Sequence, residues 1–383
     1  MILGLFFSRG ISLEVWLEKG LFDREVLIYK HYLENHIFKK IYWFTYGLKD
    51  EQLSCILKQE GRLPVNIEII QYPLFFTIFN KRLSFLYSLF LPIIQCKFIE
   101  LCDVFKTNQM DGSLAALISS GIYQKPVYVR TGYTLSRVMS EIKPWYSFRR
   151  MFASFNEALA LKYADSFSVT SDYDKAYLLS KYKSINPEIT VLGNYIDLKL
   201  FNGENKHFNV ENNRMLFVGR FSEEKNIKNA IVACNNLNIG LDLIGSGSLE
   251  DNLRLLVSNL GSDTKFLGTF PNKELSYILT RYDYFILPSL WEGMPKVLIE
   301  AMASGLVCIG NNTTGIKELI KHQLTGFLSK DGSVQSLMTA IELALNSDKH
   351  RVSSNAKQFI EKNFSLDHIF SKEREIYNHL LEK

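Results

Sequence analysis

The sequence predicts an α/β protein of two domains, in which short buried strands alternate with helices. The chain has 383 residues, too many for one ordinary domain, and 47% of them are hydrophobic, which is ample for two cores. In the second half, short apolar runs end at glycine or proline and a helix start follows each one, a pattern typical of buried parallel strands. These runs are 215–218, 241–244, 266–268 and 284–287.

The first half begins with a strand rather than a signal peptide. Residues 2–7 are apolar, have no charged segment before them, and are followed at once by Arg9 and Glu14. Further strands are expected at 126–130 and 166–170, and the C-terminal stretch 366–381 is expected to be a helix. The five cysteines include no Cys-x-x-Cys pair and lie mostly among apolar neighbours, so neither zinc nor disulfides are indicated and a reduced cytoplasmic protein fits.

The stretch from Trp291 to Gly305 is the most informative about function. Gly293 is typical of a tight turn, and Pro295 is typical of the first residue of a helix. Gly305 is expected to end that helix. The first-turn N–H groups lack internal partners, so this helix start favours an anion.

Two carboxylates, Glu292 and Glu300, span this loop and helix eight positions apart. Eight helical positions cover roughly 12 Å. One atom cannot contact both, whereas a ligand with a sugar at one end and a ribose at the other would suit them. The alternative is an ordinary surface Glu292 and a helix-face Glu300.

Two cations follow the strand at 215–218, in the run from Gly219 to Asn226. Arg220 can fork across two phosphate oxygens and Lys225 can add a point charge, so both are candidate ligands of a diphosphate. The alternative is that Arg220 and Lys225 are solvated loop residues that pair with Glu223 and Glu224.

In their order, the motifs of this half resemble the donor half of retaining glycosyltransferase family four. The resemblance is dense from about 216 to 327 and rests on these motifs: Gly-Arg-(x)4-Lys, Gly-Ser-Gly, Phe-Leu-Gly, Leu-Pro-Ser, Glu-Gly-Met-Pro-(x)4-Glu-Ala-Met-Ala-Ser-Gly and Asn-Thr-Thr-Gly-Ile-Lys-Glu. It implies the GT-B fold, two Rossmann-like α/β/α domains facing across a cleft. The expected domains are 1–194, joined by the C-terminal helix at about 366–383, and 195–365.

The resemblance also implies roles for individual residues. Arg220 and Lys225 bind the donor diphosphate, Glu300 holds the ribose hydroxyls, and Glu292 faces the sugar without serving as a covalent nucleophile. We count Arg220, Lys225 and Glu292 as catalytic. The further donor-binding positions are Gly10, Gly219, Gly245, Gly247, Leu267, Gly293, Met294 and Pro295.

The first half departs from the family pattern in two places. Relatives have paired glycines near the donor phosphates, whereas this chain has only Gly10, between Arg9 and Ser12. Many relatives place a histidine close to the sugar, and this chain has Gly132 there, so a histidine-assisted mechanism is in doubt. Arg130 or Tyr133 are alternative sources of those contacts.

Asp172 and Asp174 form an Asp-x-Asp, which in another glycosyltransferase architecture holds a divalent metal. Both follow Ser171 at a predicted helix start, and we therefore interpret the three as cap and first-turn residues. No metal and no cofactor are expected, and the donor is a UDP-sugar or a GDP-sugar.

Basic residues lie beside aromatic ones in 81–96 and 143–152, which indicates a peripheral membrane contact. The alternative is that both segments are core helices of the first domain. The apolar run in 81–96 is broken by Pro92 and falls short of the roughly 20 residues of a spanning helix, so no transmembrane segment is expected.

We therefore expect a retaining, metal-independent hexosyltransferase of surface polysaccharide biosynthesis. Its acceptor would be a lipid-linked or growing glycan, and its location the cytoplasm or the inner face of the cell membrane. A net charge of +4 gives no reason to expect a nucleic-acid partner. The alternatives are a nucleotide-sugar epimerase of GT-B fold and a non-catalytic nucleotide-sugar-binding scaffold of a polysaccharide assembly complex.

Overall fold

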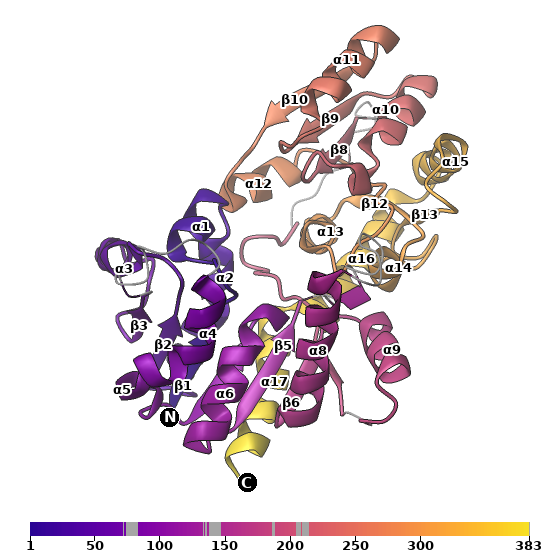
Figure 1. Cartoon of the computed structure of the whole chain (residues 1–383). Coiled ribbons are helices and arrows are strands. Elements are labelled where there is room, and N and C mark those ends of the chain that lie inside the picture. Colours follow the sequence, from indigo (N-terminus) through magenta and orange to yellow (C-terminus); the bar gives the residue numbers. More distant parts are fainter. Residues whose placement is uncertain are drawn as a thin grey trace. The chain divides into compact units, whose positions relative to one another are not determined.

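The computed structural model describes residues 1–71, 73, 83–132, 134, 136–137, 147–185, 188–203, 208 and 214–382. The chain divides into two compact units (Figure 1): unit 1 is Met1–Leu192 with Phe370–Lys383, and unit 2 is Gly193–Ile369. The boundary after Leu192 lies two residues before the expected boundary after residue 194. The chain returns to unit 1 at Phe370, four residues after the expected return at about residue 366.

The described strands of unit 1 form a 7-stranded parallel sheet in the order β3-β2-β1-β4-β5-β6-β7. They are β1 Ile2–Phe6, β2 Lys40–Phe44, β3 Ile67–Ile70, β4 Val104–Thr107, β5 Val127–Thr131, β6 Ser166–Val169 and β7 Thr190–Val191. The helices are α1 Leu13–Glu18, α2 Phe22–Glu34, α3 Asp50–Gln59, α4 Leu83–Ile94, α5 Cys96–Ile99, η2 Met110–Gly112, α6 Ser113–Tyr123, α8 Phe148–Tyr163, α9 Asp172–Lys181 and the C-terminal α17 Leu366–Leu381.

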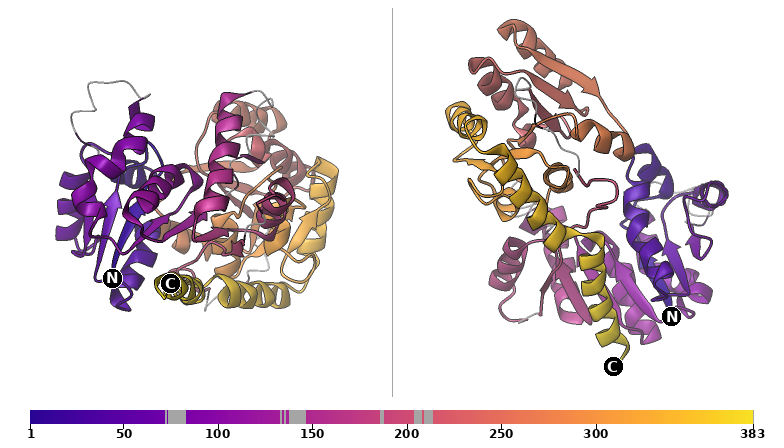
Figure 2. Two further views of the ribbon diagram at one scale, coloured as in Figure 1. Left: turned by 60° about the horizontal axis from the view of Figure 1, so that its bottom comes forward. Right: turned by 180° about the vertical axis from the view of Figure 1, so that it is seen from behind.

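Side chains of alternate strand residues in unit 1 point to opposite faces of the sheet, and different helices cover each face. On one face, Phe105 and Val129 share a core with residues of α4, α6 and α8, such as Leu91 and Ala160. On the other face, Tyr128 contacts Tyr377 of α17. Figures 1 and 2 show the yellow α17 on this second face.

In unit 2 the strand order is β10-β9-β8-β11-β12-β13, again all parallel. The strands are β8 Met215–Val218, β9 Leu241–Ile244, β10 Thr264–Gly268, β11 Tyr284–Leu287, β12 Val307–Asn311 and β13 Phe327–Ser329. The helices are η3 Glu223–Lys225, α10 Ile227–Asn236, α11 Glu250–Leu260, α12 Asn272–Leu279, α13 Lys296–Ala303, α14 Thr314–Leu319, α15 Val334–Leu345 and α16 Lys349–Phe364. The prediction of two Rossmann-like α/β domains is confirmed.

Local predictions in the 291–305 stretch are confirmed with one correction. The helix α13 runs from Lys296 to Ala303, and Gly305 follows it with a φ of 80°, the left-handed conformation expected after a helix end. Pro295 was wrongly predicted as the first helical residue. It is the N-cap, with extended backbone at φ −71° and ψ 109°, because its fixed φ also suits the position just before the helix.

A buried ion pair attaches α17 to the sheet of unit 1. The Lys106 ammonium donates to both Glu373 oxygens, at 2.9 and 3.0 Å, and to the Tyr32 hydroxyl at 2.9 Å. Rings of Tyr29, Tyr32 and Tyr128 lie 5.5, 5.2 and 5.6 Å from the ammonium. Burial disfavours both charges: it raises the pKa of Glu373 to about 8 and lowers the pKa of Lys106 well below its usual range.

Removing both members of this pair should cost less stability than the sum of the two single removals. Lys106→Met or Glu373→Leu should each lower the free energy of unfolding by about 3–5 kcal/mol, because the partner stays buried without its counter-charge. The double variant Lys106→Met/Glu373→Leu should lose less than the sum of the two. Urea unfolding of the four proteins measures this, and additive losses would contradict the coupling.

Candidate functional site

The order of the unit 2 strands predicts where a ligand binds. β8 and β11 are neighbours, and the chain leaves β8 toward β9 on one side and β11 toward β12 on the other. Open parallel sheets bind ligands at the carboxyl ends of the strands, where the order reverses in this way. The two loops at this switch point are 219–226 and 288–295, which hold most of the predicted site residues.

Hydrogen bonds join these two loops directly. The Leu290 N–H donates to the Glu224 carbonyl at 2.8 Å. The Asn226 amide donates to the carbonyls of Pro288, at 3.2 Å, and Gly332, at 2.9 Å. Asn226 has a φ of 53°, a left-handed conformation that asparagine tolerates better than most residues. Asn226 directly follows Lys225 in the sequence, but no local signal predicted that it joins two loops.

Lys225 and Glu292 are brought together at this edge. The Lys225 ammonium lies 2.5 Å from one carboxylate oxygen of Glu292, and the Ser289 hydroxyl donates to the same oxygen at 2.8 Å. Lys225 therefore pairs with Glu292, and the alternative pairing with Glu223 or Glu224 is wrong. Ser289 is fully buried and was missed as a contact of Glu292, although it belongs to the Leu-Pro-Ser motif.

Arg220 lies just past the end of β8, with an exposed side chain. Within the part of the chain that the structure describes, its guanidinium makes no hydrogen bond or ion pair, and its backbone carbonyl accepts from the Ser222 N–H at 3.1 Å. The proposed pairing of Arg220 with Glu223 or Glu224 is therefore wrong as well. The Arg220 guanidinium is therefore available to contact a ligand that binds at the switch point.

Both carboxylates of the 291–305 stretch are buried. Glu292 is 9% exposed and Glu300, in the middle of α13, is 4% exposed. The alternative of an ordinary surface Glu292 is therefore wrong. Glutamates are almost never this buried unless they have a partner, and Lys225 is such a partner for Glu292.

Gly245 and Gly247 are required by close packing of backbone on backbone. A Cβ on Gly245 would lie 1.9 Å from the Gly219 carbonyl oxygen, and one on Gly247 would lie 2.3 Å from the carbonyl oxygen of Phe221. Phe221 also donates its N–H to the carbonyl of Ser246 at 2.9 Å. These glycines therefore fix the loop that carries Gly219 and Arg220, and their predicted contact with a donor stays a prediction.

A third glycine, Gly315 of α14, supports the loop of Glu292. A Cβ on Gly315 would lie 1.6 Å from the Gly293 carbonyl oxygen. On the other side, the Asn194 amide donates to the Met294 carbonyl at 2.9 Å. Gly315 lies within the Asn-Thr-Thr-Gly motif, but the sequence did not show which backbone it approaches.

The remaining predicted donor contacts of unit 2 lie on the same structural elements. Met294 and Pro295 are buried between the Glu292 loop and α13, and Leu267 is half-buried in β10. Asn311, at the end of β12, was missed: its amide donates to the Ser289 carbonyl at 3.3 Å, and its oxygen accepts from Ser329 at 3.2 Å.

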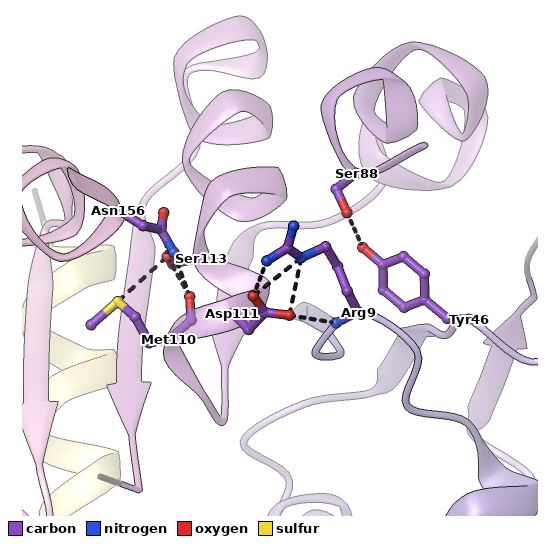
Figure 3. A network of polar contacts seen from close by, with 7 residues as sticks. All are labelled: Arg9, Tyr46, Ser88, Met110, Asp111, Ser113 and Asn156. Atoms are coloured by element: carbon purple, nitrogen blue, oxygen red, sulfur yellow. Dashed lines mark hydrogen bonds and ion pairs between the residues drawn. The ribbon is translucent and has the colours of Figure 1, made fainter. Parts of the chain in front are cut away.

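Gly10 lies in unit 1, exposed and with a φ of 73°. Its neighbour Arg9 donates from its backbone N–H and from Nε to the Asp111 carboxylate at 3.0–3.1 Å (Figure 3). Ser12 caps α1 by accepting from the Val15 N–H. The loop borders a cavity of about 650 Å³ at the carboxyl ends of β1 and β4, which is the switch point of this sheet.

Gln109 fills the space beside Gly132, where relatives are expected to carry a histidine. A Cβ on Gly132 would lie 2.6 Å from the Gln109 amide nitrogen, and the Gly132 N–H donates to the Gln109 oxygen at 3.2 Å. Arg130 lies 4.0 Å from Glu373, close to α17. Tyr133, the other predicted source of contacts, lies outside the described residues.

The interpretation of Ser171 as a helix cap is confirmed, since its hydroxyl accepts from the Asp174 N–H. The Asp174 carboxylate is buried and lies 3.1 Å from the guanidinium of Arg137. Among the described residues, no cluster of three or more His, Cys, Asp or Glu side chains is arranged to hold a metal. Nor does any helix in that part of the chain combine the length and apolar character needed to span a membrane.

Adding one methyl group at Gly315 should displace the Glu292 loop. Gly315→Ala should lower the free energy of unfolding by about 1–3 kcal/mol or more, because overpacked atoms must move. Gly121→Ala in α6 is the control, since a Cβ there meets nothing within 4 Å. Thermal unfolding compares the two, and equal stability of both variants would contradict the close approach.

The chain is similar in sequence to known glycosyltransferases. Residues 201–359 match the family model of glycosyl transferases group 1. The amylovoran biosynthesis glycosyltransferase AmsK of Erwinia amylovora is 37% identical over 146 residues, which cover 35% of this chain and 36% of AmsK. The UDP-Gal:alpha-D-GlcNAc-diphosphoundecaprenol alpha-1,3-galactosyltransferase of Escherichia coli is 26% identical over 302 residues, 73% of this chain and 76% of that protein.

Solved structures show the same fold over the whole chain. Anabaena Alr3699/HepE in complex with UDP is 20% identical, with a TM-score of 0.75 and 99% of both chains covered. Sucrose-phosphate synthase from Thermosynechococcus elongatus is 18% identical, with a TM-score of 0.73 over 100% of this chain and 99% of that one. Residues 201–359 thus resemble the glycosyl transferases group 1 family, and the two Rossmann-like domains have the GT-B fold of the solved structures.

Proposed function

We propose that this protein is a retaining, metal-independent glycosyltransferase that moves a sugar from a nucleoside-diphosphate sugar to an acceptor hydroxyl. The observation that carries this proposal is the grouping of Arg220, Lys225 and Glu292 at the switch point of unit 2. Two cations suit a diphosphate, and a carboxylate held beside them suits the hydroxyls of the attached sugar.

The cations can stabilise the leaving group. Charge builds up on the departing nucleoside diphosphate, and preorganised cations at that position lower the barrier. A lysine ammonium has three donors, so Lys225 can keep its bond to Glu292 and still donate to phosphate. The helix α13 begins at the same end of the site, and its dipole favours an anion there.

The hydrogen bonds of Glu292 favour orientation of the sugar over nucleophilic attack. One of its oxygens accepts from both Lys225 and Ser289, and these donors hold the carboxylate in one position. We therefore assign Glu292 to binding the sugar, with the acceptor attacking on the face that the diphosphate leaves. Arg220 and Lys225 supply the positive charge that a metal provides in other enzymes.

The donor and acceptor follow from the relatives. A UDP-sugar is favoured over a GDP-sugar because Anabaena HepE binds UDP and the Escherichia coli relative is named for UDP-Gal. The latter's name also includes a diphosphoundecaprenol-linked acceptor, and AmsK serves amylovoran biosynthesis. We propose a lipid-linked or growing glycan as the acceptor, in surface polysaccharide biosynthesis at the inner face of the cell membrane.

Nucleotide binding should depend on Glu300. UDP at a hundredfold excess over its dissociation constant should stabilise the folded protein by about 2.7 kcal/mol. Glu300→Gln should abolish most of this shift, because a donating amide nitrogen replaces one of the two carboxylate oxygens that accept from the ribose hydroxyls. Glu274→Gln, at an exposed glutamate of α12, should retain the shift. Melting curves with UDP, GDP and ADP measure the shift, and a full shift in Glu300→Gln would contradict the ribose role.

Arg220→Gln should slow catalysis without disturbing the fold, because the Arg220 guanidinium has no partner among the described residues. We expect kcat to fall about 10²- to 10³-fold, as for loss of one group that stabilises the transition state. UDP release from UDP-sugar with a glycan acceptor, measured with and without EDTA, gives the rate and tests the need for metal.

Product analysis separates the proposed function from its alternatives. A glycosidic product with the donor's anomeric configuration, seen by NMR, supports retaining transfer. Free epimerised nucleotide sugar would indicate an epimerase, and UDP binding without any product would indicate a binding scaffold.

A further inference from the structure

The cavity of about 650 Å³ in unit 1 has the lining of a ligand pocket. It lies at the carboxyl ends of β1 and β4, and Asn108, Gln109 and Asp111 form a polar wall. The rings of Phe7 and Trp16, whose centroids are 4.6 Å apart, form an apolar wall. Ligand pockets of proteins combine apolar surface with a few polar groups in this way.

The charges around this cavity balance. The described residues of its lining include two cations, Arg9 and Lys19, and two carboxylates, Glu25 and Asp111. Arg9 and Asp111 pair with each other. The loops at the switch point of unit 2 instead offer two cations to a diphosphate. A cavity with balanced charges and amide groups therefore suits the hydroxyls of a neutral sugar better than a phosphate, whose charge would stay uncompensated.

The side-chain amide of Gln109 has a defined orientation in this wall. The Gly132 N–H donates to one end of the amide at 3.2 Å. An oxygen can accept from that N–H whereas an amide nitrogen cannot, so this bond assigns Oε1 and Nε2. Nε2 keeps two N–H groups, and nothing among the residues that the structure describes accepts from them. Gln109 thus brings unused donors to the wall of the cavity.

Gly132 makes this position of the Gln109 amide possible. A Cβ at residue 132 would lie 2.6 Å from Nε2 and 3.2 Å from Oε1 of Gln109. The Gly132 backbone is also held on its other side, because the fully buried Thr170 donates its hydroxyl to the Gly132 carbonyl at 2.9 Å. A larger residue at 132 would therefore displace the amide, which is the end of a flexible side chain, rather than the backbone.

The loop after β4, which carries this glutamine, is fixed against the loop after β1. Gly112 allows the close approach, since a Cβ there would lie 2.8 Å from the Phe6 carbonyl oxygen. The pair of Arg9 and Asp111 joins the same two loops (Figure 3). The Arg9 guanidinium also lies 5.2 Å from the ring centroid of Phe152. Phe152 ends the segment 143–152, of which residues 143–146 lie outside the described residues.

We propose that Gln109 is a specificity-determining residue of the sugar transfer, whose Nε2 donates to a hydroxyl of a sugar bound in this cavity. Gly132 is its positioning residue. An acceptor sugar and the sugar of the donor both carry such hydroxyls. The inference rests on the proposed function, because it takes the bound sugar to be a substrate of the transfer. A site that donates to a hydroxyl rejects a sugar that lacks it, since the donor is then left unpaired.

Three substitutions test the role of the amide. Gln109→Glu keeps the size of the side chain and an oxygen for the Gly132 N–H, but an acceptor replaces the donating group. Gln109→Ala removes the amide, and Gly132→Ala displaces it. Each should lower kcat/KM for transfer about tenfold or more. Gly132→Ala/Gln109→Ala should be no worse than either single variant, because both changes remove the same interaction. Gln52→Glu, at an exposed residue of α3, is the control and should match the parent.

Two measurements tell which sugar Gln109 contacts. Hydrolysis of UDP-glucose and UDP-galactose without an acceptor depends on the donor sugar. Saturation-transfer NMR with the methyl glycosides of glucose, galactose, mannose and N-acetylglucosamine reports binding of an acceptor sugar. Slower hydrolysis by Gln109→Glu would assign the contact to the donor, and loss of the glycoside signal would assign it to the acceptor. Parent-like hydrolysis and parent-like glycoside signals in Gln109→Glu would overturn the inference.

The UDP-induced melting shift of the same proteins keeps the two proposals apart. All variants should show the shift of the parent, because the proposed nucleotide site lies in unit 2. A parent that shows the shift but neither hydrolyses donor nor binds any glycoside would overturn only the sugar contact of Gln109. Glycoside binding that is lost in Gln109→Glu, in protein without any nucleotide shift, would support this contact and contradict the donor site.

Discussion

At the carboxyl edge of the unit 2 sheet, successive loops touch through their backbones because Gly245, Gly247 and Gly315 lack a Cβ. Gly245 and Gly247 bring the loop after β9 onto the loop after β8, and Gly315 brings α14 onto the loop after β11. Side-chain packing could not hold backbones this close. The relative positions of the cations and the carboxylate therefore depend on glycines that need not contact a ligand at all.

These backbone contacts hold the loops that place a charged carboxylate, Glu292, in a buried position. Glu292 is almost fully buried, yet Lys225 and the Ser289 hydroxyl both contact it, so its charge is compensated before any ligand arrives. The amide of Asn311 in turn holds the Ser289 backbone. Arg220, by contrast, is exposed. The site thus combines a buried anion with an exposed cation, which suits a substrate whose sugar must be positioned and whose diphosphate must leave.

The sequence predicted the elements of unit 2 well, because strand ends, glycines and caps are local signals. The end of α13 before Gly305 and the identity of the charged residues needed no tertiary information. Three features did: the pairing of Lys225 with Glu292 rather than Glu223 or Glu224, the support of the Glu292 loop by Gly315, and the left-handed Asn226 between two loops. Each depends on residues distant in sequence, and one sequence does not show which of them meet.

The ion pair of Lys106 and Glu373 joins residues 267 positions apart. During synthesis, almost the whole chain must be made before the central lysine of the N-terminal sheet meets its carboxylate. Until then Lys106 and the tyrosines around it lie beside an uncovered surface. The first domain to emerge from the ribosome is therefore the last to be completed, and a nascent chain that stops before α17 would leave an aromatic surface exposed to chaperones and proteases.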